Sequence, residues 1–126
     1  MTATRRIPKP WGEEILFAHT GRYAGKVLKV RRGESLSLQY HERKDEALYL
    51  FSGRVEVTLG APGDAAGTTP AEVRRLEPGD ALHLPPGTRH RLEAVEDAIL
   101  FEVSTPELDD VVRLEDRYGR QGTSEP

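Results

Sequence analysis

The sequence predicts an all-β fold, a small barrel or jelly roll built from short strands. One observation is alternation: Val55, Val57 and Leu59 face one side of an extended segment, and the polar residues between them face the other. A second is the supply of turn residues, twelve glycines and nine prolines in 126 residues. A third observation concerns the polar side chains that are best suited to form a site. They lie on different predicted strands and come close together only if the sheet curls.

Nine strands are expected between residues 14 and 103, separated by turn-forming residues. The segment 35–40 has the composition of a strand, and the apolar run that starts at Glu46 is expected to return beside it as a hairpin. Pro85-Pro-Gly87 is typical of a turn between two strands. The expected strands are 14–18, 24–30, 35–40, 46–52, 54–59, 72–76, 80–84, 90–94 and 98–103.

The remaining segments are expected to be irregular or helical. Residues 1–12 are expected to form an irregular arm, in which Trp11, the only tryptophan, covers a barrel edge or the mouth of a pocket. The small and polar stretch 60–70 is expected to be a flexible hairpin loop.

A short C-terminal helix is expected after residue 104. Thr105 is a suitable N-cap, and Pro106 fits the first helical position. Gly119 is a natural stop. The apolar stripe of this helix would consist of Leu108, Val111, Val112 and Leu114.

Length and composition restrict the class of protein. A chain of 126 residues has room for one core, so we expect a single domain over 1–126 with its core at about 8–120. The net charge of -3 lacks the basic excess of a nucleic-acid-binding protein, and the absence of cysteine excludes disulfides. No apolar run has the length of a membrane span or the form of a signal peptide. We therefore expect a cytoplasmic protein that binds neither nucleic acid nor membrane.

The most informative feature is a pair of glycine-bounded motifs, Gly33–Gly53 and Gly79–His90. Gln39 and His41 are two residues apart in a predicted strand, so both side chains can reach one point. A hairpin would return Glu46 beside His41. Two imidazoles, a carboxylate and an amide suit a divalent ion such as Zn, Mn, Fe, Co or Ni. The candidate metal ligands are Gln39, His41, Glu46 and His90.

These motifs resemble the paired motifs of the cupin superfamily. There the first motif carries His-x-His and a glutamate between two glycines, and the second carries Pro-x-Gly, a histidine and a closing asparagine. Gln39 stands here in place of the first histidine and Ala94 in place of the asparagine. Further segments resemble the type II mannose-6-phosphate isomerase domain, which in that family often follows a nucleotidyltransferase domain. They are Lys9–Gly12, Leu36–His41, Pro85–Glu93 and Asp109–Arg120.

The resemblance implies a metal-dependent, homodimeric isomerase that interconverts mannose 6-phosphate and fructose 6-phosphate through a metal-stabilised enediol. It also implies that cationic side chains hold the phosphate, with the C-terminal segment folding over the site. A solvated charged face and a helix held by salt bridges are the alternative accounts of these cations. The cationic candidates are Lys44, Arg91, Arg113 and Arg120.

The general base is not identified by the sequence. Glu46, as a metal ligand, would be a poor choice because its lone pair is engaged. His83 faces away from Leu82 and Leu84, and the alternative to a base in the pocket is a structural or surface histidine. The candidates are Lys29, His83, Glu93 and Glu102.

Other functions stay open. The chain has Lys44 where the isomerase family usually has arginine and Leu48 where it usually has tryptophan, and a glycine-rich segment is shortened to Thr105–Leu108. These departures leave two alternatives, a metal-binding cupin that acts on another sugar and a non-catalytic sugar-binding module. Iron-dependent cupin dioxygenases use a similar pocket, but histidine normally fills the position of Gln39.

Overall fold

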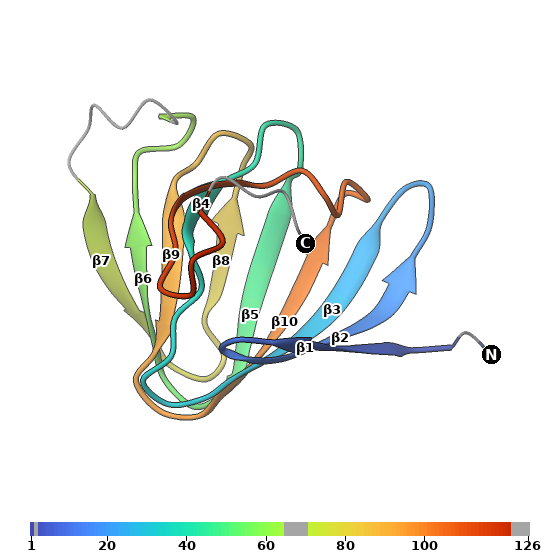
Figure 1. Ribbon diagram of the computed structural model, residues 1–126, viewed down its shortest axis with the longest axis horizontal. Coiled ribbons are helices and arrows are strands. Elements are labelled where there is room, and N and C mark those ends of the chain that lie inside the picture. The colour runs from blue at the N-terminus through green and yellow to red at the C-terminus, as the bar shows by residue number, and fades with distance from the viewer. Residues whose placement is uncertain (2, 65–70, 122–126) are drawn as a thin grey trace.

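The computed structural model describes residues 1, 3–64 and 71–121, and within these ranges all regular structure is β (Figure 1). Two antiparallel sheets face each other, with strand orders β1-β2-β3-β10-β5-β8 and β11-β4-β9-β6-β7. This arrangement confirms the predicted all-β jelly roll. The strands are β1 (Arg5–Lys9), β2 (Gly12–His19), β3 (Ala24–Val30), β4 (Leu38–Tyr40), β5 (Glu46–Ser52), β6 (Val55–Leu59), β7 (Glu72–Leu76), β8 (Ala81–Leu84), β9 (His90–Ala94), β10 (Ala98–Ser104) and β11 (Val112–Glu115).

All nine predicted strands are present, with small differences at their ends. The largest difference is in the segment 35–40, where only β4 belongs to the ladder and Ser35 makes an isolated bridge to Glu93. The predicted irregular arm is wrong, because β1 pairs with β2 along its whole length. Of the predicted loop 60–70, residues 65–70 lie outside the described residues.

The predicted C-terminal helix is also wrong. Residues 108 and 109 form a turn, and β11 then pairs with β4, with Val112 opposite Tyr40. The Thr105 hydroxyl accepts a hydrogen bond from the backbone N–H of Asp45, so it does not cap a helix. An isolated helix of this length has little stability of its own, so the backbone partners offered by β4 decide the conformation.

The interior changes in character along the strands. In β3 and β10 the residues that point inward are apolar toward one end, where Leu28 and Leu100 are buried. Toward the other end the same alternation places Lys26 opposite Glu102, and both are buried. Trp11 is 3% exposed and packs on the apolar cluster. The molecule thus has an apolar core at one end of the barrel and a charged interior at the other.

The charged end is covered by the segment that joins β10 to β11. Figure 1 shows this segment passing over the end of the barrel where the β4–β5 and β8–β9 loops lie. Within the described ranges no helix has the length and apolar character needed to cross a membrane.

Gly53 in the β5–β6 turn tests the packing of the first motif. Its φ is 85°, and an added Cβ would lie 2.2 Å from the carbonyl oxygen of Asp97. Gly33 has a similar φ of 81° but open space around the added carbon. We expect Gly33→Ala to lower the free energy of unfolding by about 1 kcal/mol through left-handed strain alone. Gly53→Ala should cost about 1–3 kcal/mol more, because backbone must shift.

Urea denaturation of both variants measures the difference. Equal losses of stability in the two variants would show that the contact with Asp97 is relieved at no cost.

Candidate metal centre and adjoining cavity

Three potential ligands converge at the charged end of the barrel. His41 follows β4, Glu46 opens β5 and His90 opens β9, and all three side chains are buried. The distance from Glu46 Oε1 to His41 Nε2 is 3.1 Å, and to His90 Nε2 it is 3.3 Å. One ligand atom from each residue lies within 4.8 Å of the other two. This group could hold one metal ion.

Hydrogen bonds fix the orientation of both imidazole rings. His41 Nδ1 donates to the carbonyl oxygen of Asp110 at 2.5 Å, and His90 Nδ1 donates to that of Thr88 at 2.9 Å. A carbonyl oxygen has no proton to give, so each Nδ1 carries one. In a neutral ring, Nε2 then carries a lone pair that faces the Glu46 carboxylate. A hydrogen bond from Nε2 to Glu46 would require the ring to be a charged imidazolium. A divalent cation bound among these atoms would use the lone pairs and the carboxylate together, as in histidine-rich metal sites.

Gln39 lies beside this group but its amide oxygen is engaged elsewhere. It is opposite His90 in the β4–β9 pairing, and its Nε2 is 3.5 Å from His90 Nε2. Its Oε1 accepts a hydrogen bond of 2.6 Å from the Ser37 hydroxyl. A half-turn of the amide would exchange these two partners, because the serine hydroxyl can also accept. As placed, Gln39 turns its amide nitrogen toward the site, and the half-turn would present the oxygen that a metal ion needs.

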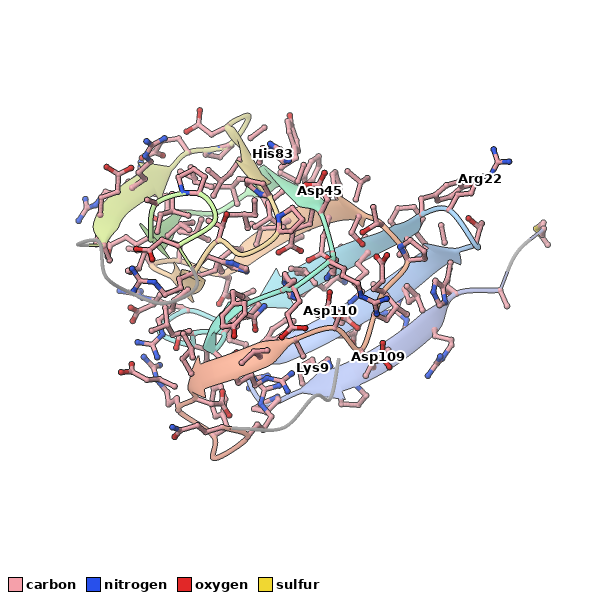
Figure 2. The ribbon with its side chains drawn as sticks, turned by 90° about the horizontal axis from the view of Figure 1, so that it is seen from above. Lys9, Arg22, Asp45, His83, Asp109 and Asp110 are labelled. Carbon is pink, nitrogen blue, oxygen red and sulfur yellow. The ribbon has the colours of Figure 1, made fainter. Side chains whose placement is uncertain are left out.

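Asp110 holds the loop between β4 and β5 in place. Its carboxylate accepts hydrogen bonds of 2.7–3.0 Å from the backbone N–H groups of Glu42, Arg43 and Lys44. Burial raises the pKa of the Asp110 carboxyl, but these three N–H groups outweigh it and lower the pKa below its ordinary value. With its carbonyl bound to His41, Asp110 connects the β10–β11 segment to the first motif. It lies at the centre of the view in Figure 2.

A chain of buried ion pairs continues from Glu46 into the six-stranded sheet. Lys44 Nζ lies 3.4 Å from Glu46 and 3.2 Å from Glu102. Lys26 Nζ lies 4.0 Å from Glu102 and 3.1 Å from Glu14. Positive and negative groups alternate along this chain, and each buried charge has an opposite neighbour. Such pairing is what makes the burial of charge tolerable.

The pKa values in this chain are shifted by burial and by neighbouring charge. Burial raises the pKa of Glu46, but its hydrogen bonds to His41 and His90 and the charge of Lys44 bring it well below the ordinary value. Burial lowers the pKa of His90, but Glu46 outweighs this effect and raises it. Burial lowers the pKa of Lys44, but Glu102 and Glu46 outweigh it and raise the pKa. Glu46 thus stays ionised and Lys44 stays charged.

Glu102 behaves differently from Glu46. Burial and the nearby charge of Glu46 raise the pKa of Glu102 to about 7, although Lys44 and Lys26 act in the opposite direction. This carboxyl can therefore exist in both protonation states near neutral pH.

A cavity adjoins the group of ligands. Its wall includes five cationic side chains and two carboxylates, Glu14 and Glu102, so it attracts anions. The lining residues are Lys9, Trp11, Glu14, Lys26, Leu28, Leu36, Gln39, His41, Lys44, Glu102, Leu108, Val111, Arg113 and Arg120. Arg120 also pairs with Asp116, 3.1 Å away.

The structure brings some of the predicted substrate and base residues to this cavity and not others. Lys44, Arg113, Arg120 and Glu102 line it. Lys29, on the outer face of β3, lies opposite Glu13.

Arg91 and Glu93 point to the outer side of β9, since His90, Leu92 and Ala94 are its buried residues. Arg91 pairs there with Glu115 at 3.2 Å and Glu93 with Arg117 at 3.6 Å.

His83 also lies outside the cavity. Its Nε2 is 2.7 Å from the Asp45 carboxylate, and both side chains are largely exposed. Figure 2 shows these two residues together, apart from Asp110 and Lys9. This position agrees with the alternative of a surface histidine.

Sequence reasoning missed three charged residues of the site, Lys9, Glu14 and Lys26. The last two could have been found from strand alternation. Lys26 falls on the same side of β3 as the buried Leu28 and Val30, and Glu14 falls on the same side of β2 as the buried Leu16. A charge at an inward position of a half-buried strand indicates a polar interior.

Comparisons with known proteins identify the family. The model of the cupin domain matches residues 26–104. The chain is 35% identical over 121 residues to the mannose-1-phosphate guanylyltransferase ManC of Salmonella typhimurium, and 33% identical over 121 residues to the xanthan biosynthesis protein XanB of Xanthomonas campestris. Each match covers 92% of this chain but only 23% of ManC and 24% of XanB. A guanylyltransferase is a nucleotidyltransferase. The name of ManC therefore agrees with the resemblance to an isomerase domain that often follows a nucleotidyltransferase domain.

Solved structures agree with the fold. KdgF from Halomonas sp. superposes with a TM-score of 0.69 at 30% identity, covering 86% of this chain and 91% of that one. Oxalate decarboxylase from Bacillus subtilis gives 0.73 at 16% identity, covering 88% of this chain and 30% of that one, and shows the shared fold alone. The paired motifs, the two facing sheets and these matches establish that the chain belongs to the cupin family.

Proposed function

We propose that this chain binds one divalent ion through His41, Glu46 and His90, with Gln39 as a fourth contact after a half-turn of its amide brings Oε1 to the ion in place of Nε2. We further propose that it isomerises a sugar phosphate, of the type that interconverts mannose 6-phosphate and fructose 6-phosphate. The observation that carries the proposal is the convergence of two oriented imidazoles and a carboxylate beside a cationic cavity. When bound, the ion (Zn, Mn, Fe, Co or Ni) supplies Lewis-acid polarisation of the substrate carbonyl.

The cations of the cavity would hold the phosphate. Arg113 and Arg120 come from the C-terminal segment, and their guanidinium groups suit bidentate contact with phosphate oxygens. Arg120 would exchange its two hydrogen bonds to Asp116 for the phosphate. The charge of Lys44 is already shared between two carboxylates, so we assign it the role of orienting Glu102. Arg91 receives no role, because it pairs with Glu115 on the outer side of β9.

Glu102 is the best candidate for proton transfer between C1 and C2 of the sugar. Of the four bases considered from the sequence, it alone lines the cavity. A general base is most effective when its pKa lies near the working pH, and burial with the charge of Glu46 raises the pKa of Glu102 to about 7. Lys44, 3.2 Å away, would hold the carboxylate in place while the proton is transferred.

The names of the relatives support the substrate class. ManC is named for mannose 1-phosphate, and XanB for xanthan biosynthesis. This chain spans less than a quarter of each, so their activities bear on it only through this proposal.

An alternative is binding of an unphosphorylated sugar, without turnover or with another reaction. It is favoured by one observation: Lys44, which stands where the isomerase family usually has arginine, is held by two buried carboxylates. Leu48 and Ala94, the other departures in the motifs, are buried in the core.

Metal binding tests the first part of the proposal. We expect protein that has been stripped of metal by a chelator to bind one equivalent of a divalent ion. The variants His41→Ala and His90→Ala should bind no detectable metal, because each lacks one ligand. His83→Ala is the matched control, since this histidine is exposed and pairs with Asp45. Titration calorimetry and elemental analysis measure the stoichiometry. Equal binding by His41→Ala and His83→Ala would exclude the proposed ligand set.

A substitution at Asp110 tests whether the β4–β5 loop supports the metal site. Asp110→Ala removes the acceptor of three backbone N–H groups beside His41, so we expect metal affinity to fall by about 10- to 100-fold. Asp109→Ala changes an exposed neighbour and should leave the affinity unchanged. Similar affinities in the two variants would show that the loop keeps its conformation without the carboxylate.

Turnover tests the second part. We expect metal-reconstituted protein to form fructose 6-phosphate from mannose 6-phosphate, and Glu102→Gln to lower kcat by about 100-fold or more while metal binding persists. Glu93→Gln changes an acid on the outer side of β9 and should retain activity. If the unmodified chain binds one equivalent of metal but does not turn over mannose 6-phosphate, the isomerase proposal is rejected and the sugar-binding module remains. Equal kcat values for Glu102→Gln and the unmodified chain would instead reject Glu102 as the base.

A further inference from the structure

The inner face of the six-stranded sheet carries a charged side chain on each of five neighbouring strands. The strands β5, β10, β3, β2 and β1 lie side by side in this order (Figure 1). The charged residues are, in the same order, Glu46, Glu102, Lys26, Glu14 and Lys9, and the last four line the cavity. Glu46 is a proposed metal ligand and Glu102 the proposed base, but the proposed function gives Lys26 and Glu14 no role.

Lys26 and Glu14 form a buried ion pair in the wall of the cavity. Lys26 is 4% exposed and Glu14 5%, and Lys26 Nζ donates a hydrogen bond of 3.1 Å to Glu14 Oε1. The Glu102 carboxylate, 4.0 Å from Lys26 Nζ, is beyond hydrogen-bond distance. An ammonium has three N–H donors and a carboxylate about four acceptor positions. The pair therefore keeps hydrogen-bonding capacity for a ligand in the cavity.

The stability of the fold gives little reason for a charged pair at these two positions. In the β2–β3 ladder Lys26 is opposite Leu16 and Glu14 is opposite Leu28, and both leucines are buried. Apolar side chains would therefore find apolar neighbours there. Replacement of a buried ion pair by apolar residues is often neutral or stabilising, so the pair is better explained by what it binds.

The chemistry of the pair matches a hydroxyl group. A hydroxyl can donate to the Glu14 carboxylate and accept from the Lys26 ammonium at the same time. A phosphate would be repelled by Glu14. Hydroxyl groups on a carbon chain are therefore the ligands that suit this part of the wall.

The phosphate fits better at the next position along the sheet, where Lys9 lines the cavity together with Arg113 and Arg120. Burial lowers the pKa of Lys9, and the charge of Glu14 opposes this effect. The charges of Lys26, Arg120 and Arg113 lower the pKa of Lys9 further, so cations gather at this end of the cavity. The ion pair thus lies between the candidate metal centre and the cationic end.

We propose that Glu14 and Lys26 form a hydroxyl-binding subsite that recognises the polyhydroxylated carbon chain of the sugar. The reacting carbons would lie toward Glu46 and Glu102, and the phosphate toward Lys9. The subsite selects a chain that carries hydroxyls over an apolar chain of equal length. It rests on the proposed function for its class of ligand, a sugar phosphate, but not on turnover.

Calorimetric titration of the metal-loaded chain with two phosphate monoesters tests the subsite. Mannitol 1-phosphate carries the hydroxyls but no carbonyl, so it cannot be isomerised, and hexyl phosphate has an equally long chain without hydroxyls. We expect Glu14→Gln and Lys26→Met to weaken binding of mannitol 1-phosphate by about 10- to 100-fold, as for lost hydrogen bonds to charged groups. Glu14→Gln should not weaken binding of hexyl phosphate, because it removes a carboxylate that opposes the phosphate.

Glu13→Gln and Lys29→Met are the matched controls. Glu13 and Lys29 lie on the same two strands but on their outer faces, opposite each other in the ladder. Both variants should bind the two esters like the unmodified chain. Circular dichroism shows whether each variant is folded. If a single variant at Glu14 or Lys26 is not, the double variant Glu14→Gln/Lys26→Met takes its place, because it leaves neither member of the pair without its partner.

Deoxy analogues of mannitol 1-phosphate identify the hydroxyl that is bound. We expect removal of that hydroxyl to weaken binding to the unmodified chain but not to Glu14→Gln, because the contact is already lost in the variant. A merely structural role of Glu14 would instead give the same loss for every analogue in both proteins.

The outcomes separate this subsite from the proposed isomerisation. Equal weakening of the two esters by Glu14→Gln, or no weakening of either, would overturn the subsite and leave the isomerisation standing. Glu14-dependent binding of mannitol 1-phosphate by a chain that does not turn over mannose 6-phosphate would support the subsite and reject the isomerisation. If the unmodified chain does not bind mannitol 1-phosphate, both the subsite and the sugar phosphate as its ligand are rejected.

Discussion

The constraint on which the rest of the structure depends is the interior shared by two facing sheets. In β3, β5, β9 and β10, every second residue enters that interior, whatever its chemistry. At one end these residues are leucine and valine, and at the other they are Glu46, Lys26 and Glu102. Buried charges are tolerated only when they are paired, so the charged end becomes an ordered chain of alternating groups. That order gives the candidate metal centre and the adjoining cavity a fixed frame.

Long-range contacts complete this frame. The carbonyl oxygen of His41 accepts a hydrogen bond from Gly87, and its imidazole donates to Asp110. The carbonyl oxygens of His41 and Asp110, together with the Asp110 carboxylate, therefore hold the two motifs and the C-terminal segment together. The side chains in the cavity can change while the orientation of the imidazoles is kept. This separation explains how one fold can serve different chemistries.

The six-stranded sheet has two faces with different roles. Its inner face combines apolar residues with ionised side chains, and its outer face carries exposed aromatic side chains, among them the stacked rings of Tyr49 and Phe101. In most half-buried sheets the polar residues face outward, whereas this sheet also exposes large apolar side chains such as Phe51 and Phe101. Both faces belong to the same strands, so β10 contributes Glu102 to the interior and Phe101 to the exterior.

The sequence by itself determined the strands β2 to β10 and the identity of the candidate ligands, because alternation within a strand and residue spacing within a motif can be read from the sequence. It did not determine the conformation of the C-terminal segment. The apolar residues after Thr105 fit a helix or a strand equally, and only pairing with the free edge of β4 selects a strand. Nor could it separate Glu102 from Glu93, since both are acids in strands. Which of the two reaches the cavity depends on which face of its strand is enclosed, and only the packing of the two sheets fixes that.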